Sequence, residues 1–273
     1  MNWKQAIRRI APPLLVDLHA KIRHGAQMGH VWGGVYEHFR TVPTGGDGFR
    51  GSEWLRSLQV ALEHQAAQCT ADGTLSPSVA GENSMLPLLG SVVCHETKKV
   101  TVLDFGGGAG GTFLPFISGM ADCRAVDYHV VEMPEICEIG RRFWSREARI
   151  HFHAELPSEL PAVDIVYISS ALQYVEDYRG LLRRLCEYRP RFFLFVKLSA
   201  GDIPTYATRQ RNVKGSSIPY WFVNVGELIA LMAEAGYGLR FKGVLEREYN
   251  QDNFPERYRL RRACNLLFAR AAP

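Results

Sequence analysis

The sequence predicts an α/β fold with a doubly wound, mostly parallel sheet, and two observations lead to this prediction. From Lys98 onward, short runs rich in β-branched and aromatic residues alternate with segments of helical periodicity, which is the order of parallel strands covered by helices on both faces. In addition, the apolar run from Val100 to Phe105 is followed directly by the glycine-rich stretch "GGGAGG". We therefore expect a buried strand that turns tightly where the backbone can approach a ligand.

The C-terminal part departs from a regular alternation of strands and helices. The segment "VGELIALMAEAG" is predicted to be a helix with Asn224 as its N-cap, Glu227 three residues later, and an end at Gly236. Two strand-like segments follow with no helix between them, "YGLRFKGVLE" and "ACNLLFARA". Because parallel neighbours need a long crossover, these two should pair as an antiparallel hairpin. The predicted sheet therefore has seven strands with an antiparallel last strand.

Two regions lie outside this pattern. Residues 1–95 show helical patches, such as the one from Glu53 to Gln68, broken by glycine and proline clusters and without strand alternation. We expect a helical N-terminal extension or lid over residues 1–95 and a cofactor-binding domain over residues 96–273. Residues 202–223 follow the fifth strand without helical or strand periodicity. A loop of that length in a compact domain usually covers or binds a ligand.

Composition and charge restrict the function. The 273 residues are 47% hydrophobic, and 32 basic against 28 acidic residues leave a net charge of +4. That charge is too small and too dispersed to predict a nucleic-acid partner. The six cysteines form no CxxC pair, which favours reduced thiols in a cytoplasm over a zinc site or a disulfide framework. Since no apolar run reaches the ~20 residues of a membrane span, we expect a cytoplasmic protein.

The glycine-rich stretch fits two cofactor motifs. Counted from Gly106 it matches G-x-G-x-x-G, the dinucleotide motif, and counted from Asp104 it matches D-x-G-x-G-x-G, the S-adenosylmethionine loop. The glycines alone do not choose between the two. The choice between the two cofactors must come from Asp104, since a carboxylate suits an ammonium group and would repel a pyrophosphate, and from the order of the elements downstream.

Several segments together carry a family resemblance. Asp104 before the glycines, Glu132 at the end of "HVVEM" and the segment "ISSALQYVED" resemble the class I S-adenosylmethionine-dependent methyltransferases, which have a Rossmann-like fold, over residues 98–271. More narrowly, "WGGVYEHF", "LDFGGGAGG", "VVEMPEICEIGRRF", "SSALQYVEDY" and "SSIPYWFVNVGELIALM" resemble a methyltransferase family whose genes often lie among those for surface polysaccharide, including lipopolysaccharide O-antigen.

The resemblance implies S-adenosylmethionine as cofactor and O-methylation of a sugar, either in a small molecule or in a lipid-linked glycan. Two alternatives stay open, an NAD(P)-dependent oxidoreductase and a non-catalytic cofactor-binding partner in a glycan-assembly complex. Glu132 would accept the ribose hydroxyls, and Glu155 would lie near the adenine. The implied cofactor site comprises Asp104, Gly106, Gly107, Gly108, Gly110, Glu132, Met133, Glu155 and Ser169.

Catalysis and acceptor binding have their own candidates. Methyl transfer to oxygen is an in-line displacement that needs alignment and a group to take the hydroxyl proton. Gln173 and Tyr174, after the fourth strand, are the first candidates for these catalytic roles, and His30 or His38 are alternatives for the base. The loop over residues 202–223 provides side chains for an anion and for stacking on a sugar ring, namely Arg209, Arg211, Tyr220 and Trp221. The same loop could instead be a solvated basic segment with its aromatic residues in the core.

The segment "HFHAE" could be interpreted as an HxHxE metal set. However, His151 and His153 alternate on a strand that is expected at the sheet edge, where one polar face is ordinary. We therefore predict no metal site.

The first 23 residues carry a short apolar stripe at helical spacing with basic residues beside it: Trp3, Ile7 and Ile10 with Lys4, Arg8 and Arg9. Such a segment could lie on the inner face of a membrane, where lipid-linked glycans are assembled. Packing of the stripe onto the domain is the favoured interpretation, because the stripe is short and Pro12 and Pro13 end it.

Overall fold

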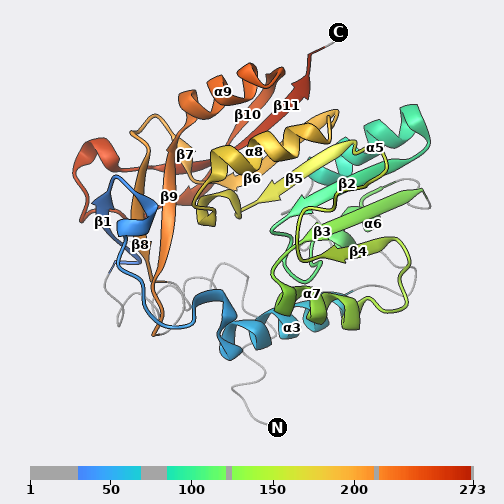
Figure 1. Ribbon diagram of the computed structural model, residues 1–273, viewed down its shortest axis with the longest axis horizontal. Helices are drawn as coiled ribbons and strands as arrows, with labels where there is room; N and C mark the ends of the chain where they lie inside the picture. The colour runs from blue at the N-terminus through green and yellow to red at the C-terminus, as the bar shows by residue number, and fades with distance from the viewer. Residues whose placement is uncertain (1–29, 69–84, 121–124, 212–214, 272–273) are drawn as a thin grey trace, which may run out of the picture.

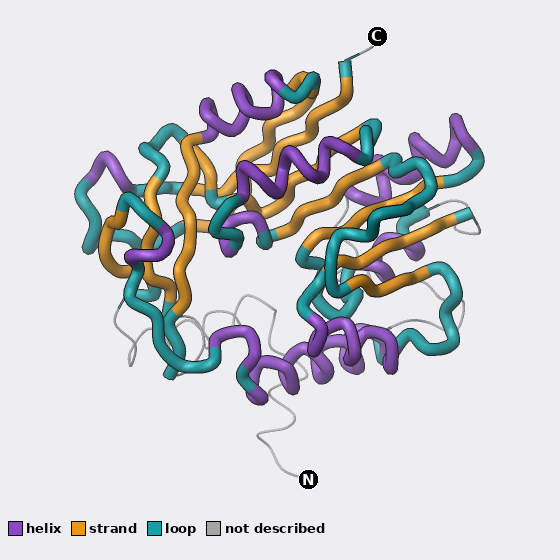
Figure 2. Tube along the Cα trace, in the orientation of Figure 1, coloured by secondary structure: helices purple, strands orange, loops and turns teal. Residues whose placement is uncertain are grey.

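The computed structural model describes residues 30–68, 85–120, 125–211 and 215–271, which form two sheets with their helices (Figures 1 and 2). The segment over residues 1–23, predicted to contact a membrane or to pack on the domain, lies outside these residues. Among the helices of the described residues, none has the length and apolar character needed to cross a membrane.

The larger sheet has seven strands in the order β10-β11-β6-β5-β2-β3-β4. Strands β2 to β6 run parallel, β11 runs antiparallel to β6, and β10 pairs with β11 as a hairpin. The predicted mostly parallel sheet with its closing antiparallel hairpin is therefore confirmed. The strands are β2 (Val100–Phe105), β3 (Val126–Val131), β4 (Ile150–His153), β5 (Ile165–Ser169), β6 (Phe192–Leu198), β10 (Tyr237–Glu248) and β11 (Arg262–Arg270).

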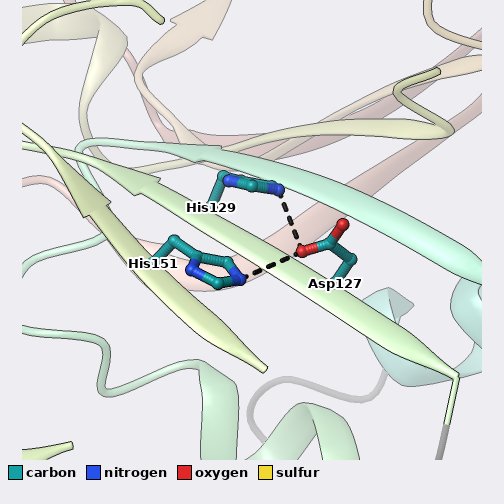
Figure 3. Close-up of side chains that lie close together, drawn as sticks. All are labelled: Asp127, His129 and His151. Atoms are coloured by element: carbon teal, nitrogen blue, oxygen red, sulfur yellow. Dashed lines mark ion pairs between the residues drawn. The ribbon is translucent and has the colours of Figure 1, made fainter. Parts of the chain in front are cut away.

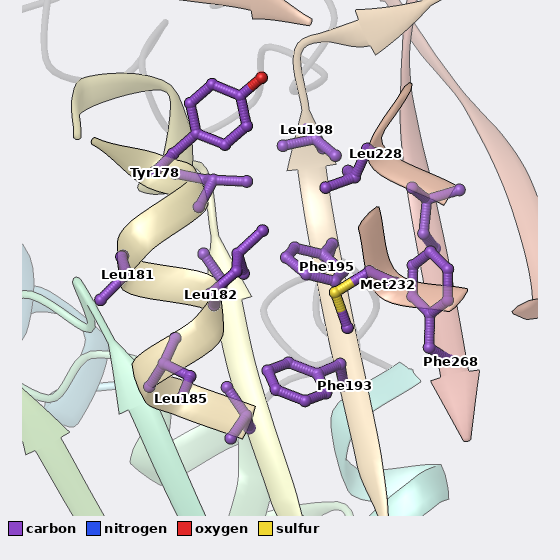
Figure 4. Packing of buried hydrophobic residues seen from close by; sticks show 14 of the residues in the cluster. Tyr178, Leu181, Leu182, Leu185, Phe193, Phe195, Leu198, Leu228, Met232 and Phe268 are labelled. Carbon is purple, nitrogen blue, oxygen red and sulfur yellow. The ribbon is translucent and has the colours of Figure 1, made fainter. Parts of the chain in front are cut away.

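Helices cover both faces of this sheet. On one face, α5 (Met85–Thr97), α6 (Phe113–Ser118) and α7 (Pro134–Phe143) contribute apolar residues to one core cluster. On the other face, α8 (Tyr178–Glu187) and α9 (Val225–Glu234) pack against β5, β6 and β11 (Figure 4). Helix α8 buries Leu181, Leu182 and Leu185, which recur at helical spacing, and this periodicity produces its single apolar face.

Helix α9 begins as the sequence predicts. The side chain of Asn224 accepts a hydrogen bond from the backbone N–H of Glu227 at 2.9 Å, and the chain leaves the helix at Gly236 with φ of 86°. The return bond of a capping box does not form. Instead, the backbone N–H of Asn224 donates to Thr205, and the carboxylate of Glu227 accepts from Arg179.

A second sheet corrects two expectations. It has the order β1-β8-β9-β7, from β1 (Trp32–Tyr36), β7 (Ala200–Gly201), β8 (Tyr206–Gln210) and β9 (Ile218–Asn224). The predictions of a strandless N-terminal extension and of a loop without strands over residues 202–223 are therefore wrong. Buried polar residues such as Thr208 and Gln210 hide the alternation of β8. Because β1 comes from residues 1–95, this sheet joins the two predicted domains.

The N-terminal region also contributes one helix. Helix α3 (Ser52–Ala66) falls within the helical patch predicted from Glu53 to Gln68. Its apolar residues, including the buried Leu62, pack against Ile136 of α7 and against Ala109 of the glycine loop, and the two helices lie side by side in Figure 1. Short 3-10 turns complete the described elements: η1 (Phe39–Thr41), η2 (Gly48–Arg50), η4 (Leu172–Tyr174) and η5 (Glu256–Tyr258).

We expect the replacement Asn224→Ala to lower the free energy of unfolding by about 1 to 2 kcal/mol, because it removes the cap of α9. It also removes the hydrogen bond from Asn224 Nδ2 to the carbonyl of Ile203. Asn224→Asp keeps the capping acceptor and should lose less. Urea denaturation of the three proteins measures both effects, and an equal loss in the two variants would contradict the capping role.

Candidate functional site

The glycine loop after β2 is shaped mostly by contacts within the protein. A Cβ at Gly106 would collide with the side chain of Ala171, and one at Gly110 would lie 2.7 Å from the ring nitrogen of Trp144. Gly108 differs, because it has φ of 60° and a Cβ there would meet nothing within 4 Å. The open side of the loop therefore lies at Gly108, and this is the position where a ligand has room to approach.

Asp104 lies beneath this loop at the end of β2. It is 1% exposed, its Oδ2 accepts a hydrogen bond from the hydroxyl of Tyr128 at 2.7 Å, and its Oδ1 is buried without a hydrogen-bond partner. Burial raises the pKa of Asp104 to about 7, the Tyr128 hydrogen bond opposes this, and the nearby carboxylate of Glu132 adds to it. Both the unpaired oxygen and the raised pKa indicate a site that would accept a cation.

Glu132, directly after β3, is the second carboxylate. Its side chain accepts a hydrogen bond from the backbone N–H of Met133 at 2.7 Å. Burial raises the pKa of Glu132, while backbone hydrogen bonds from Met133 and Gly108 lower it. The bond from Gly108 shows that Glu132 borders the open side of the glycine loop. Met133 itself is half-buried against the cluster between α3 and α7.

The segment after β5 lies against the glycine loop, through the contact of Ala171 with Gly106. It begins at Ser169 and turns at Ser170, where φ is 53°. Gln173 is 1% exposed, donates from Nε2 to Ser170 Oγ at 3.2 Å, and has a buried Oε1 without a hydrogen-bond partner. An amide oxygen in this state can accept a hydrogen bond from an acceptor hydroxyl.

Tyr174, the next residue, is held between aromatic rings. Phe49 meets it edge-on at 4.8 Å and Tyr220 edge-on at 5.1 Å. Phe49 belongs to the N-terminal region, and sequence reasoning did not select it. The structure thus brings residues of the N-terminal region, of η4 and of β9 together around one predicted catalytic side chain.

The predicted aromatic platform does not form as expected. Tyr220 pairs with Thr208 in the antiparallel register, faces the aromatic core with Trp32, and is buried. Trp221 points to the opposite face of β9, where it stacks on Phe39 at 5.4 Å. Adjacent residues of a strand point to opposite faces. Tyr220 and Trp221 therefore cannot stack on the same sugar ring, and Tyr220 is a core residue.

The remaining predicted side chains are spread out. Arg209 is half-buried opposite Gly33, and its Nε is buried without a hydrogen-bond partner. Arg211 is exposed at the end of β8, and Glu155 is exposed in the loop after the edge strand β4. The alternative bases His30 and His38 are also exposed. Neither of these two histidines contributes to the group of residues around Gly108.

Sequence reasoning did not predict the cavity of about 300 Å³ that lies beside Trp221. Three of its side chains are acidic, so its walls can accept hydrogen bonds from several hydroxyl groups. Two of these acids belong to the segment "YVEDY", which the sequence marked only for its position after β5. The cavity is lined by Glu37, Glu176, Asp177, Tyr178, Arg179, Thr205 and Trp221.

Comparison with known proteins places the fold. No family model and no curated protein matches the sequence. One similar structure, from Haloferax volcanii, is a complex between the Trm112 methyltransferase activator and a protein that is named as a candidate methyltransferase. The two aligned chains are 16% identical, the alignment covers 83% of this chain and 97% of the matched chain, and the TM-score is 0.51. An uncharacterised protein from Burkholderia thailandensis is 12% identical, with coverages of 79% and 86% and a TM-score of 0.50. The chain therefore has the Rossmann-like fold found among methyltransferases.

The raised pKa of Asp104 predicts how stability changes with pH. An unfolded chain loses this proton near the ordinary value of 3.8, whereas the folded chain keeps it until about 7. Between these values the folded state binds more protons, so this group lowers stability as pH rises. We expect Asp104→Asn to gain about 2 to 3 kcal/mol relative to the parent protein between pH 5 and pH 8. Urea denaturation at both pH values tests this, and a difference independent of pH would exclude it.

Proposed function

We propose that this protein is an S-adenosylmethionine-dependent methyltransferase, with its cofactor held at the open side of the glycine loop. The observation that carries the proposal is the buried Oδ1 of Asp104, which has no hydrogen-bond partner and lies under a loop whose open side is at Gly108. A second carboxylate, Glu132, borders the same place. A cofactor with an ammonium group would supply the donors and the positive charge that this pair lacks.

The alternative cofactor fits these residues less well. A dinucleotide would bring a pyrophosphate beside two carboxylates, and like charges repel. S-adenosylmethionine, when bound, supplies a methyl group on a sulfonium. Glu132 would accept the ribose hydroxyls, as the resemblance implies, and Met133, Ser169 and Glu155 would line the rest of the site.

Transfer to a hydroxyl requires the chain to orient that hydroxyl and to receive its proton. The amide of Gln173 cannot act as a base, but its unpaired Oε1 can accept a hydrogen bond and direct the acceptor oxygen. The ring of Tyr174 is fixed by Phe49 and Tyr220, so its hydroxyl is the candidate to contact the acceptor.

For the acceptor, we propose a sugar of a surface polysaccharide or lipopolysaccharide precursor. The cavity beside Trp221 supports a polyhydroxyl ligand, because its carboxylates can accept hydrogen bonds from hydroxyl groups. Arg209, which does not line this cavity, has an unpaired Nε that supports a separate contact with an anionic group, such as a phosphate of a nucleotide sugar or of a lipid-linked glycan. A cytoplasmic location, with contact of residues 1–23 to the inner membrane face, is part of this proposal.

The first test is cofactor binding by isothermal titration calorimetry, with S-adenosylhomocysteine compared with NAD and NADP. We expect only the first to bind. Glu132→Ala should weaken its affinity by about tenfold or more, since a hydrogen-bonded charged acceptor is lost. Glu138→Ala is the matched control, because Glu138 is an exposed acid of α7 that pairs with Arg142. Binding of a dinucleotide, or equal affinity in the Glu132 variant, would refute the cofactor assignment.

The second test concerns Arg209. With nucleotide-linked sugars as acceptors and labelled S-adenosylmethionine as donor, Arg209→Lys should lower kcat/KM by about tenfold or more, because lysine lacks the planar fork that binds phosphate. Arg211→Lys should have a smaller effect, since Arg211 is exposed. Affinity for S-adenosylhomocysteine should not change in either variant. A parallel loss of cofactor affinity would mean that Arg209 is structural, and methylation of none of the acceptors would favour the non-catalytic alternative.

A further inference from the structure

One face of strands β3 and β4 carries a group of ionisable side chains. Asp127 and His129 alternate with the buried Tyr128 on β3, and His151 and His153 alternate with the buried Phe152 on β4. The parallel register places His129 directly beside His151. The connection from β4 to β5, residues 154–164, forms no helix, although such a crossover is usually helical. The polar side chains of two strands therefore gather on a face that the described connection between β4 and β5 does not cover with a helix.

Three potential ligand atoms converge within this group. Asp127 Oδ1 lies 3.0 Å from His129 Nε2 and 3.2 Å from His151 Nε2, and all three atoms lie within 4.8 Å of one another (Figure 3). The two imidazole rings are stacked, with centroids 4.9 Å apart. Ligand atoms bound tetrahedrally to zinc at ordinary bond lengths are separated by about 3.3 Å. The observed spacing is therefore close to that of a coordination site.

His129 has the environment of a ligand. It is 6% exposed, and its Nε2 is turned toward Oδ1 of Asp127, with the two atoms 3.0 Å apart. Its other ring nitrogen, Nδ1, lies 3.0 Å from His153 Nε2. If Nδ1 carries the proton and donates it to His153, the lone pair of Nε2 is available to a metal. Histidines that bind metals are commonly oriented by such a partner.

One oxygen of Asp127 remains for a cation, and the site has an opening to solvent. Lys99 lies 3.6 Å from Oδ2 of Asp127, which leaves Oδ1 for the two histidines. The side chain of His151 is 44% exposed, which leaves a path for an ion to enter.

We propose that Asp127, His129 and His151 form a binding site for a divalent transition-metal ion, most suitably Zn²⁺, apart from the proposed cofactor site. Two imidazole nitrogens and one carboxylate oxygen are a ligand set that suits zinc, with a fourth position for water. The ion would tie the edge strand β4 to β3 where no helix does so. The set differs from the HxHxE pattern in the sequence, because His153 orients His129 and Glu155 is exposed in the following loop.

Isothermal titration calorimetry with Zn²⁺ tests this on the full chain after treatment with a chelator. We expect one ion per chain, with affinity reduced by about tenfold or more in His151→Ala and in Asp127→Asn. His95→Ala is the matched control, since His95 is an exposed histidine of α5. Circular dichroism without metal checks that the variants fold, and Zn²⁺ should raise the melting temperature of the parent protein but not of the variants.

Titration with Co²⁺ identifies the ligands independently. Binding at this site should produce the visible absorption bands of a nitrogen- and oxygen-ligated Co²⁺ and no thiolate charge-transfer band. A thiolate band would assign the ion to cysteines and overturn the proposal. No stoichiometric binding to the parent chain, or equal affinity in the His151 and Asp127 variants, would also overturn it and leave these residues as ion pairs only.

Discussion

A buried carboxylate at the end of the central strand is the constraint on which the rest of the site depends. Burial favours the neutral form of Asp104, and Tyr128 satisfies only one of its oxygens. Position 107 of the glycine loop requires a glycine, because a Cβ at Gly107 would collide with the carboxylate of Asp104. Glu132 adds a second negative charge nearby. The protein thus carries an electrostatic cost at this place that a bound cation would offset.

The N-terminal region packs against the candidate site. Strand β1 pairs with β8 of the C-terminal half, and α3 packs on α7 and on the glycine loop. Phe49, between these two elements, meets the ring of Tyr174. Residues that are more than a hundred positions apart in the chain therefore determine how the predicted catalytic side chain is held. The apolar contacts that join the two regions also fix the groups around the open side of the loop.

The two faces of β3 have different surroundings. One face contributes to the candidate cofactor site, and the other carries the proposed metal ligands. Tyr128 faces the helices α5 and α6 and donates a hydrogen bond to Asp104. Asp127 and His129 lie on the opposite face, where the connection from β4 to β5 forms no helix. A helix between β4 and β5 would have required apolar residues on that face. Because this connection forms no helix, the face can hold the polar group that we propose as a metal site. Along β3, this group lies several residues before Glu132.

The sequence by itself determined the large sheet, the glycine loop and the C-terminal hairpin, because these follow from local patterns: apolar runs, glycines after a strand, and two strands without a crossover. It also identified the cap at Asn224, and it selected Asp104 and Glu132 as candidate site residues. Only the tertiary structure decided the small sheet, since buried Thr208 and Gln210 interrupt the alternation of β8. Strand register, which depends on pairing partners distant in the chain, placed Tyr220 in the core, turned Trp221 outward, and set His129 beside His151.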